Sequence, residues 1–283
     1  MISRLVSSVV GFCAMLVLAA AVAAPASAVP YAGTLGDLNS TVSFDSSSGL
    51  TSWVVDTLPQ LKLQWFYYRL DGMTQEMALG AGSLGFVKAK PGDADYDTGN
   101  ETLNAVYGSE TGFSAALTYV LSGGLTGSHQ SDLQETISFT NKTSQTVHLQ
   151  FYQYVDFDLN GTPGNDTVQV LNANTVRQSD GTVSVAETVV TPAPLHTEVG
   201  VYGATLAKLT DTSADNLNDS TAPVGPADVT WALQWDVTVA PGSTVQISKD
   251  KNIVPEPATL GLMGLGLVAA VVTRVRKARR QVA

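Results

Sequence analysis

The clearest pattern in the chain is a strict alternation of apolar and polar positions over residues 229–239. Valine, tryptophan and leucine occupy every second position, and smaller or polar side chains lie between them. Successive side chains of a β-strand point to opposite faces of a sheet, so the alternation predicts a half-buried strand. Pro241 and Gly242 then supply type II turn chemistry, and Val245 and Ile247 resume the apolar positions. We therefore predict a β-hairpin over residues 229–247.

Similar segments recur along the middle of the chain, separated by turns rich in glycine, asparagine and aspartate. Residues 133–140 and 146–158 form a second predicted hairpin. Further strands are predicted at residues 61–70, 113–121, 167–171, 182–185 and 199–206. Many strands joined by short turns predict an all-β fold, a single antiparallel β-sandwich domain over residues 29–253. An antiparallel barrel is the alternative.

The first 28 residues have the three parts of a secretory signal peptide. Residues 1–4 carry a positive charge, residues 5–24 are almost entirely apolar, and Ala26 and Ala28 give the small-x-small pattern of a cleavage site. We predict passage through the secretion translocon and cleavage by signal peptidase between Ala28 and Val29. An uncleaved membrane anchor is the alternative.

Residues 258–273 contain no charged side chain, and a basic cluster begins at Arg274. A helix of this length spans about 24 Å, which is short for a hydrocarbon core of about 30 Å. The basic cluster would stay on the cytoplasmic side. Pro255, Glu256 and Pro257 precede the apolar segment, and two prolines favour an extended backbone that suits the cleft of a processing enzyme. The pattern predicts a short transmembrane helix; a plain C-terminal tail anchor is the alternative.

This order of Pro-Glu-Pro, a short glycine- and leucine-rich helix and a basic tail resembles the PEP-CTERM sorting signal of Gram-negative bacteria. The resemblance covers residues 254–283. It implies recognition by an exosortase, a membrane transpeptidase that removes the helix and tail. It also implies an inner-membrane intermediate, held through residues 258–273, followed by release to the cell surface or extracellular matrix of a bacterium that makes exopolysaccharide.

Composition narrows the possible partners. The chain has 15 Lys+Arg against 25 Asp+Glu, a net charge of −10; residues 29–253 alone hold 9 basic and 24 acidic residues, a net charge of −15. Such a surface lacks the basic face of a nucleic-acid-binding protein, so we predict no nucleic-acid partner. The one cysteine, Cys13, lies in the predicted signal peptide. A disulfide framework and a cysteine-ligated zinc or iron–sulfur site are thereby excluded.

Two acidic segments are candidates for a calcium site, because calcium takes six to eight oxygen ligands and alternating aspartates begin its best-known loop. Neither segment completes the EF-hand pattern. The alternatives without a metal are a solvated acidic turn for the first segment and a strand end with an Asn-Gly turn for the second. The candidate ligands are Asp93, Asp95 and Asp97 in the first segment, and Asp156, Asp158 and Asn160 in the second.

Aromatic side chains are candidates for sugar binding, because their flat faces stack on sugar rings. Trp65 and Tyr68 belong to a run of four aromatic residues, which must occupy both faces of one strand. Tyr152 and Tyr154 lie opposite the apolar face of their predicted strand, where exposure is expected. Packing of these rings in the core is the alternative.

No complete catalytic motif is present. The glycine-rich segment 80–85 lacks the βαβ surroundings of a dinucleotide site and the helix of a nucleophile elbow. We therefore predict a protein that is not an enzyme and that has a structural or adhesive role in exopolysaccharide or biofilm. The first alternative is a carbohydrate-binding module. The second is a secreted glycoside hydrolase, because that class of enzyme needs only two suitably spaced carboxyls.

Overall fold

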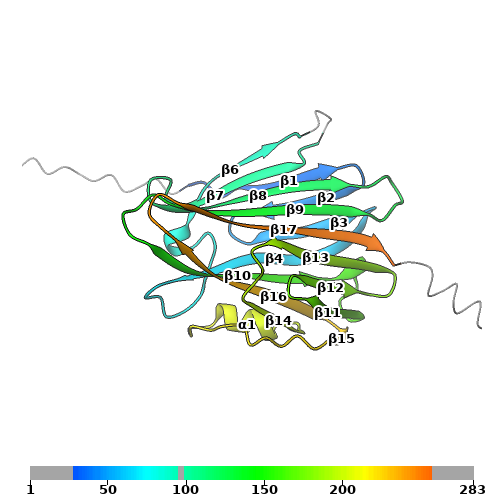
Figure 1. The fold of residues 1–283 in the computed structure, drawn as a ribbon. Helices are drawn as coiled ribbons and strands as arrows, with labels where there is room; N and C mark the ends of the chain where they lie inside the picture. Colours follow the sequence, from blue (N-terminus) through cyan, green and yellow to red (C-terminus); the bar gives the residue numbers. More distant parts are fainter. Residues whose placement is uncertain (1–27, 95–98, 257–283) are drawn as a thin grey trace, which may run out of the picture.

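The computed structural model describes residues 28–94 and 99–256, which form two antiparallel sheets packed face to face (Figure 1). The all-β sandwich predicted from the alternation is confirmed. The predicted transmembrane helix at residues 258–273 lies outside the described residues. Within the described part of the chain, no helix is long and apolar enough to span a bilayer.

The first sheet has eight strands. Their order is β1 (Ala32–Asp37), β2 (Ser40–Asp45), β3 (Gly49–Val55), β4 (Leu58–Leu70), β10 (Val147–Phe157), β16 (Val229–Val239) and β14 (His196–Val201), with β5 (Met77–Ala78) paired to β4.

The second sheet has nine strands. Their order is β15 (Val224–Ala227), β11 (Asp166–Asn172), β12 (Thr175–Ser179), β13 (Val183–Thr191), β17 (Thr244–Pro255), β9 (Ser131–Asn141), β8 (Phe113–Gly123), β7 (Thr102–Gly108) and β6 (Phe86–Gly92). Three short helices complete the described elements: η1 (Gly82–Leu84), η2 (Leu159–Gly161) and α1 (Ala204–Thr210).

Both predicted hairpins are wrong in their pairing, although each of their strands exists. β16 pairs with β10 and β14 in the first sheet, whereas β17 pairs with β13 and β9 in the second. Likewise β9 and β10 lie in different sheets. Alternation fixes which side chains face the core but not which strand lies alongside. The turns at 141–146 and 240–243 therefore carry the chain across the core from one sheet to the other.

Asn141 holds these two crossing turns together. Its side-chain amide donates hydrogen bonds to the carbonyls of Gln145, at 2.7 Å, and Val239, at 2.9 Å. Its backbone carbonyl accepts from the amide of Gly242 at 2.7 Å. Gly242 has a φ of 72°, a left-handed conformation that glycine adopts without a steric cost.

Aromatic rings fill much of the space between the sheets. Phe139 of the second sheet meets Phe151 of the first edge to face, with ring centroids 4.9 Å apart. Phe44 and Tyr119 make a second contact across the core at 5.8 Å. Burial of such rings supplies the main favourable free energy of folding in a domain with no cystine to hold it together.

A cluster of four charges is also buried between the sheets. Glu135, Glu187, Lys249 and Lys251 extend from the second sheet, and their side chains are at most 1% exposed. Both lysines bind Glu135, and their ammonium nitrogens lie 3.2 and 3.3 Å from Glu187.

The first sheet supplies hydrogen bonds to the same charge cluster. Gln64 donates to both carboxylate oxygens of Glu135 at 2.9 Å, and Gln153 and the indole of Trp231 donate to Glu187 at 2.9 Å. The charges balance, and the hydrogen bonds run between the sheets. We therefore expect the cluster to specify how the two sheets align.

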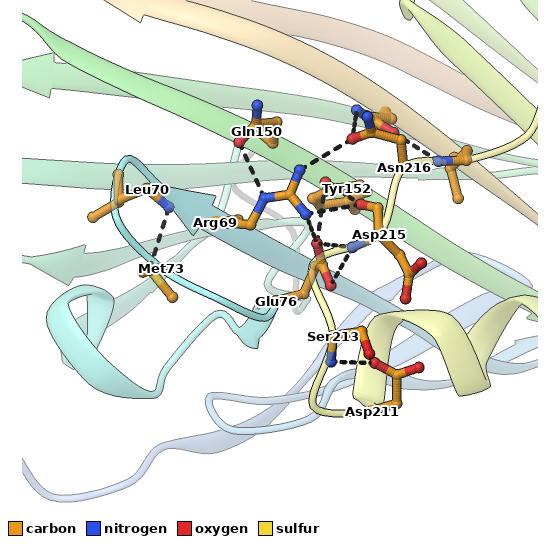
Figure 2. Close-up of polar contacts among 12 residues, drawn as sticks. Arg69, Leu70, Met73, Glu76, Gln150, Tyr152, Asp211, Ser213, Asp215 and Asn216 are labelled. Carbon is orange, nitrogen blue, oxygen red and sulfur yellow. Dashed lines mark hydrogen bonds and ion pairs between the residues drawn. The ribbon is translucent and has the colours of Figure 1, made fainter.

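The outer face of the first sheet is covered by the segment that follows α1. Arg69 lies 2.5 Å from Glu76 and donates to the carbonyl of Asp215 and the side chain of Asn216, both at 3.1 Å (Figure 2). The hydroxyl of Tyr152 donates to the carbonyl of Asp215 at 2.8 Å. These bonds fasten the covering segment, so side chains on both faces of β10 are buried.

Candidate metal centre

Three aspartates meet where β10 ends and β16 begins. The two strands are antiparallel with Asp156 opposite Thr230, and the same register extended by two residues sets Asp158 opposite Asp228. One carboxylate oxygen from each of Asp156, Asp158 and Asp228 lies within 4.8 Å of the other two. Residues 70 or more positions apart in the chain are thus brought together by one strand pairing.

Polar atoms of this cluster are buried without partners. Asp156 is 2% exposed, and its Oδ1 has no hydrogen-bond partner among the described residues. Oδ1 of Asp228, a partly buried residue, also has no hydrogen-bond partner among the described residues. Buried polar groups without a partner are rare and costly, so these oxygens are candidate ligands for a cation.

Electrostatics around the cluster are unfavourable for carboxylates alone. Burial, followed by the neighbouring Asp158 and Asp228, raises the pKa of Asp156 to about 7, and Lys62 opposes this only in part. Burial also raises the pKa of nearby Asp166 to about 7, against hydrogen bonds from Leu159 and Gln178. A cation among these groups would remove the conflict, because it favours the charged form of every carboxyl around it.

The donor set fits a hard divalent cation such as calcium. Calcium binds carboxylate, hydroxyl and water oxygens at about 2.3–2.6 Å, so two oxygens that share the ion lie at most about 5.2 Å apart. The three carboxylate oxygens, within 4.8 Å of one another, meet that limit. Asp158 and Asp228 are only partly buried, so further coordination positions would open to solvent.

The structure brings together two of the three ligands predicted in this segment. Asp156 and Asp158 are in the cluster, but Asn160 is not. The side-chain amide of Asn160 donates instead to Asp180, at 2.7 Å, and to Thr182, at 3.0 Å. Asp228 was not predicted as a ligand. Its signal in the sequence is its place directly before the strand at 229–239, which is informative only once that strand is paired with β10.

Only part of the first acidic segment lies within the described residues. Asp95 and Asp97 lie outside the described residues. Asp93 is described, and beside it the amide of Ala94 donates to Glu101 at 2.7 Å. A calcium site formed by Asp93, Asp95 and Asp97 stays a prediction.

The predicted sugar-binding surface is wrong, because all four of its rings are buried. Trp65 is 2% exposed, and Tyr68, Tyr152 and Tyr154 are 0% exposed. Trp65 packs against Phe44 and Tyr107, and the Tyr68 hydroxyl donates to the carbonyl of Ala81 at 2.7 Å. Tyr152 lies under the segment that covers the first sheet, as described above, and no sugar could stack on these faces.

The residues predicted for processing lie at the two ends of the domain. Ala28 and Val29 precede β1, and Pro255 is the last residue of β17. Glu256 follows, and its carboxylate accepts hydrogen bonds from Arg177 and, at 2.8 Å, from Ser179. Ala26, Pro257 and Arg274 lie outside the described residues.

Comparison with known proteins identifies the C-terminal segment. A family model described as the PEP-CTERM protein-sorting motif matches residues 254–277, which confirms the resemblance seen in the sequence. A comparison with curated proteins gives no match.

Solved structures share the fold. A bacterial glucoamylase complexed with acarbose is similar at 9% sequence identity with a TM-score of 0.56, over 83% of this chain and 34% of the glucoamylase. This chain thus spans about a third of that enzyme's length. A galactose mutarotase related enzyme from Lactobacillus acidophilus is similar at 10% identity and a TM-score of 0.48, over 80% of this chain and 97% of that one. At 9% identity the likeness to the glucoamylase shows the fold alone.

Proposed function

We propose that this chain, which carries the PEP-CTERM sorting motif, is exported as a surface or matrix protein with a structural, adhesive role in exopolysaccharide. In this proposal its β-sandwich binds calcium through Asp156, Asp158 and Asp228. The observation that carries the proposal is the acidic cluster, in which one oxygen each of Asp156 and Asp228 is buried without a partner, in a domain joined directly to a sorting signal.

The C-terminal sorting motif indicates where the chain is delivered. The motif marks the chain for exosortase processing and for membrane-anchored sorting to the cell surface. Final release into the matrix, and passage through the translocon and signal peptidase, are part of the proposal.

Calcium supplies the means of adhesion. A domain of net charge −15 over residues 29–253 repels an anionic polymer at long range and attracts cations. Asp156 would bind the calcium ion from its buried side. On the other side, near the partly buried Asp158 and Asp228, coordination positions would stay open to a ligand from outside the protein. A carboxylate of the polysaccharide can complete such a shell, so one ion would bridge protein and polymer.

Co-sedimentation of residues 29–256 with the producing cell's exopolysaccharide tests the proposal. We expect binding in about 1 mM calcium and loss of binding in EDTA. The variant Asp228→Asn, which removes one charge from the cluster, should bind weakly in calcium. Asp211→Asn is the matched control, because Asp211 is an exposed loop aspartate whose carboxylate accepts a hydrogen bond from the amide of Ser213.

Three results would count against this role. Binding in EDTA equal to binding in calcium would remove the cation from the mechanism. Absence of binding in both conditions would remove the polysaccharide. Equal sedimentation with a neutral dextran would show that the polymer's acidic groups are not recognised.

A further inference from the structure

The sorting motif begins inside the folded domain. β17 lies between β13 and β9 in the interior of the second sheet, and its pairing with β13 continues to Pro255, opposite Val183. The amide of Glu256 then donates to the carbonyl of Thr182 at 2.8 Å. In Figure 1 β17 is the orange strand that ends beside β13, where the grey trace begins. Pro255 thus belongs to the sheet, and the backbone of Glu256 is hydrogen-bonded to it.

The side chain of Glu256 occupies a small polar site on that sheet. Its Oε1 forms an ion pair with Arg177 of β12 and accepts a hydrogen bond from the Ser179 hydroxyl at 2.8 Å. The Glu256 side chain is only 12% exposed. The turn that follows β12 is itself fixed, because Asp180 accepts hydrogen bonds from the amides of Thr182 and Val183.

Chain length leaves little room between this site and the apolar segment. Three residue steps separate Pro255 from Ala258, where the charge-free run begins, and they span at most about 10 Å. An enzyme that binds Pro-Glu-Pro at the membrane must therefore meet the edge of the folded domain. Pro-Glu-Pro includes Glu256, whose carboxylate Arg177 and Ser179 already bind.

We infer that Arg177, Ser179 and the backbone of Thr182 form a docking site for the glutamate of the chain's own sorting motif. We call the precursor with its motif docked in this way the latched form. In the latched form the end of β17 must separate from β13 before a processing enzyme can bind. This inference rests on the exosortase processing in the proposed function. It adds that the folded domain slows that step.

Pulse-chase labelling of the full-length chain, in a host that has the exosortase, measures the rate at which precursor is converted. We expect Arg177→Ala to speed conversion about threefold, since a partly exposed ion pair with hydrogen bonds contributes modestly to holding the strand end. Arg177→Lys keeps the charge and should lie nearer the wild type. Lys88→Ala, which breaks the exposed ion pair with Glu110 elsewhere, should leave the rate unchanged.

A reversible lock tests the latch in the opposite direction. Ser184 and Val254 are antiparallel partners across β13 and β17. Ser184→Cys combined with Val254→Cys would join the strand end to its neighbour and leave Pro-Glu-Pro intact. We expect conversion of the oxidised pair to be at least about tenfold slower, because the strands stay joined, and to recover on reduction.

Equal conversion rates for the wild type, Arg177→Ala and the oxidised cysteine pair would overturn the latch. That result differs from failure of the proposed sorting, in which the wild-type precursor itself would not be converted.

Discussion

Replacement of Pro255, Glu256 and Pro257 by alanine is expected to leave the precursor in the inner membrane. The family match covers these residues, and the extended backbone that two prolines impose is lost in the variant. Cell fractionation and immunoblotting of the full-length chain measure the effect. We expect nearly all of the wild-type protein, and almost none of the variant, in the surface and extracellular fractions.

The structure supplies a control for this variant. The triple replacement also removes the contact between Glu256 and Arg177 and changes the end of β17, so a folding defect would mimic a sorting defect. Arg177→Ala removes the same ion pair while the motif stays intact. Its release should be at least as fast as that of the wild type. Normal release of the triple variant would contradict the sorting role of the motif.

Loss of one buried carboxylate should strongly destabilise the sandwich. Glu187→Ala leaves Lys249 and Lys251 with Glu135 alone and takes the acceptor from Trp231 and Gln153. Breaking a buried ion pair from one side costs about 3–5 kcal/mol, because a charge is left uncompensated. Urea denaturation of residues 29–256 should show a fall of that size in the free energy of unfolding.

Two comparisons separate this effect from an ordinary loss of packing. Lys88→Ala breaks an exposed ion pair and should leave the free energy of unfolding nearly unchanged, because solvent screens such pairs. Glu187→Leu with Lys251→Met removes one charge of each sign and should recover part of the loss, since apolar replacements of buried pairs are often tolerated. A loss below about 1 kcal/mol for Glu187→Ala would contradict the structural role of the cluster.

The carboxylate of Glu187 should also make the stability of the domain fall at acid pH. The lysines and hydrogen bonds around Glu187 outweigh its burial and lower its pKa from the ordinary 4.5 to about 2. A depressed pKa in the folded state contributes stability above the unfolded value, and this contribution fades as the pH falls from 4.5 toward 2. The Glu187→Ala variant should lack that part of the acid destabilisation.

The alternation of side chains was enough to predict the sandwich and its longest strands, but not the partners of those strands. The strand predicted at 199–206 ends at Val201, and its last three residues belong to α1. β16 and β17 carry clean patterns with a turn between them, and those patterns suit a hairpin and a crossing between sheets equally well. Burial on one face is all that a period of two encodes. The true pairing depends on packing across the core, such as Phe139 against Phe151.

Unknown strand pairing also explains why the candidate metal site was predicted only in part. Asp156 and Asp158 are neighbours in the sequence and could be seen there, whereas Asp228 joins them only through the pairing of β16 with β10. Tyr152 was expected to be exposed because its neighbours alternate, but a distant segment covers it through Asp215. The buried charges did leave a signal: Lys249 and Lys251 stand between Ile247 and Ile253 at positions that the alternation assigns to the core.

Thermal unfolding of residues 29–256 at a pH of about 8, with calcium and with EDTA, tests the cation site most directly. Without a cation the raised pKa values of Asp156 and Asp166, about 7, make the folded domain less stable as the pH rises from about 4 through 7. Calcium takes the place of the protons and should raise the melting temperature at this pH. Calcium at about 100 times its dissociation constant would stabilise the fold by about 2.7 kcal/mol.

The predicted result is a calcium-dependent rise in melting temperature that is large at a pH of about 8, small at a pH of about 5, and absent from Asp228→Asn. No rise in about 1 mM calcium, or an equal rise in wild type and Asp228→Asn, would contradict a calcium site at Asp156, Asp158 and Asp228.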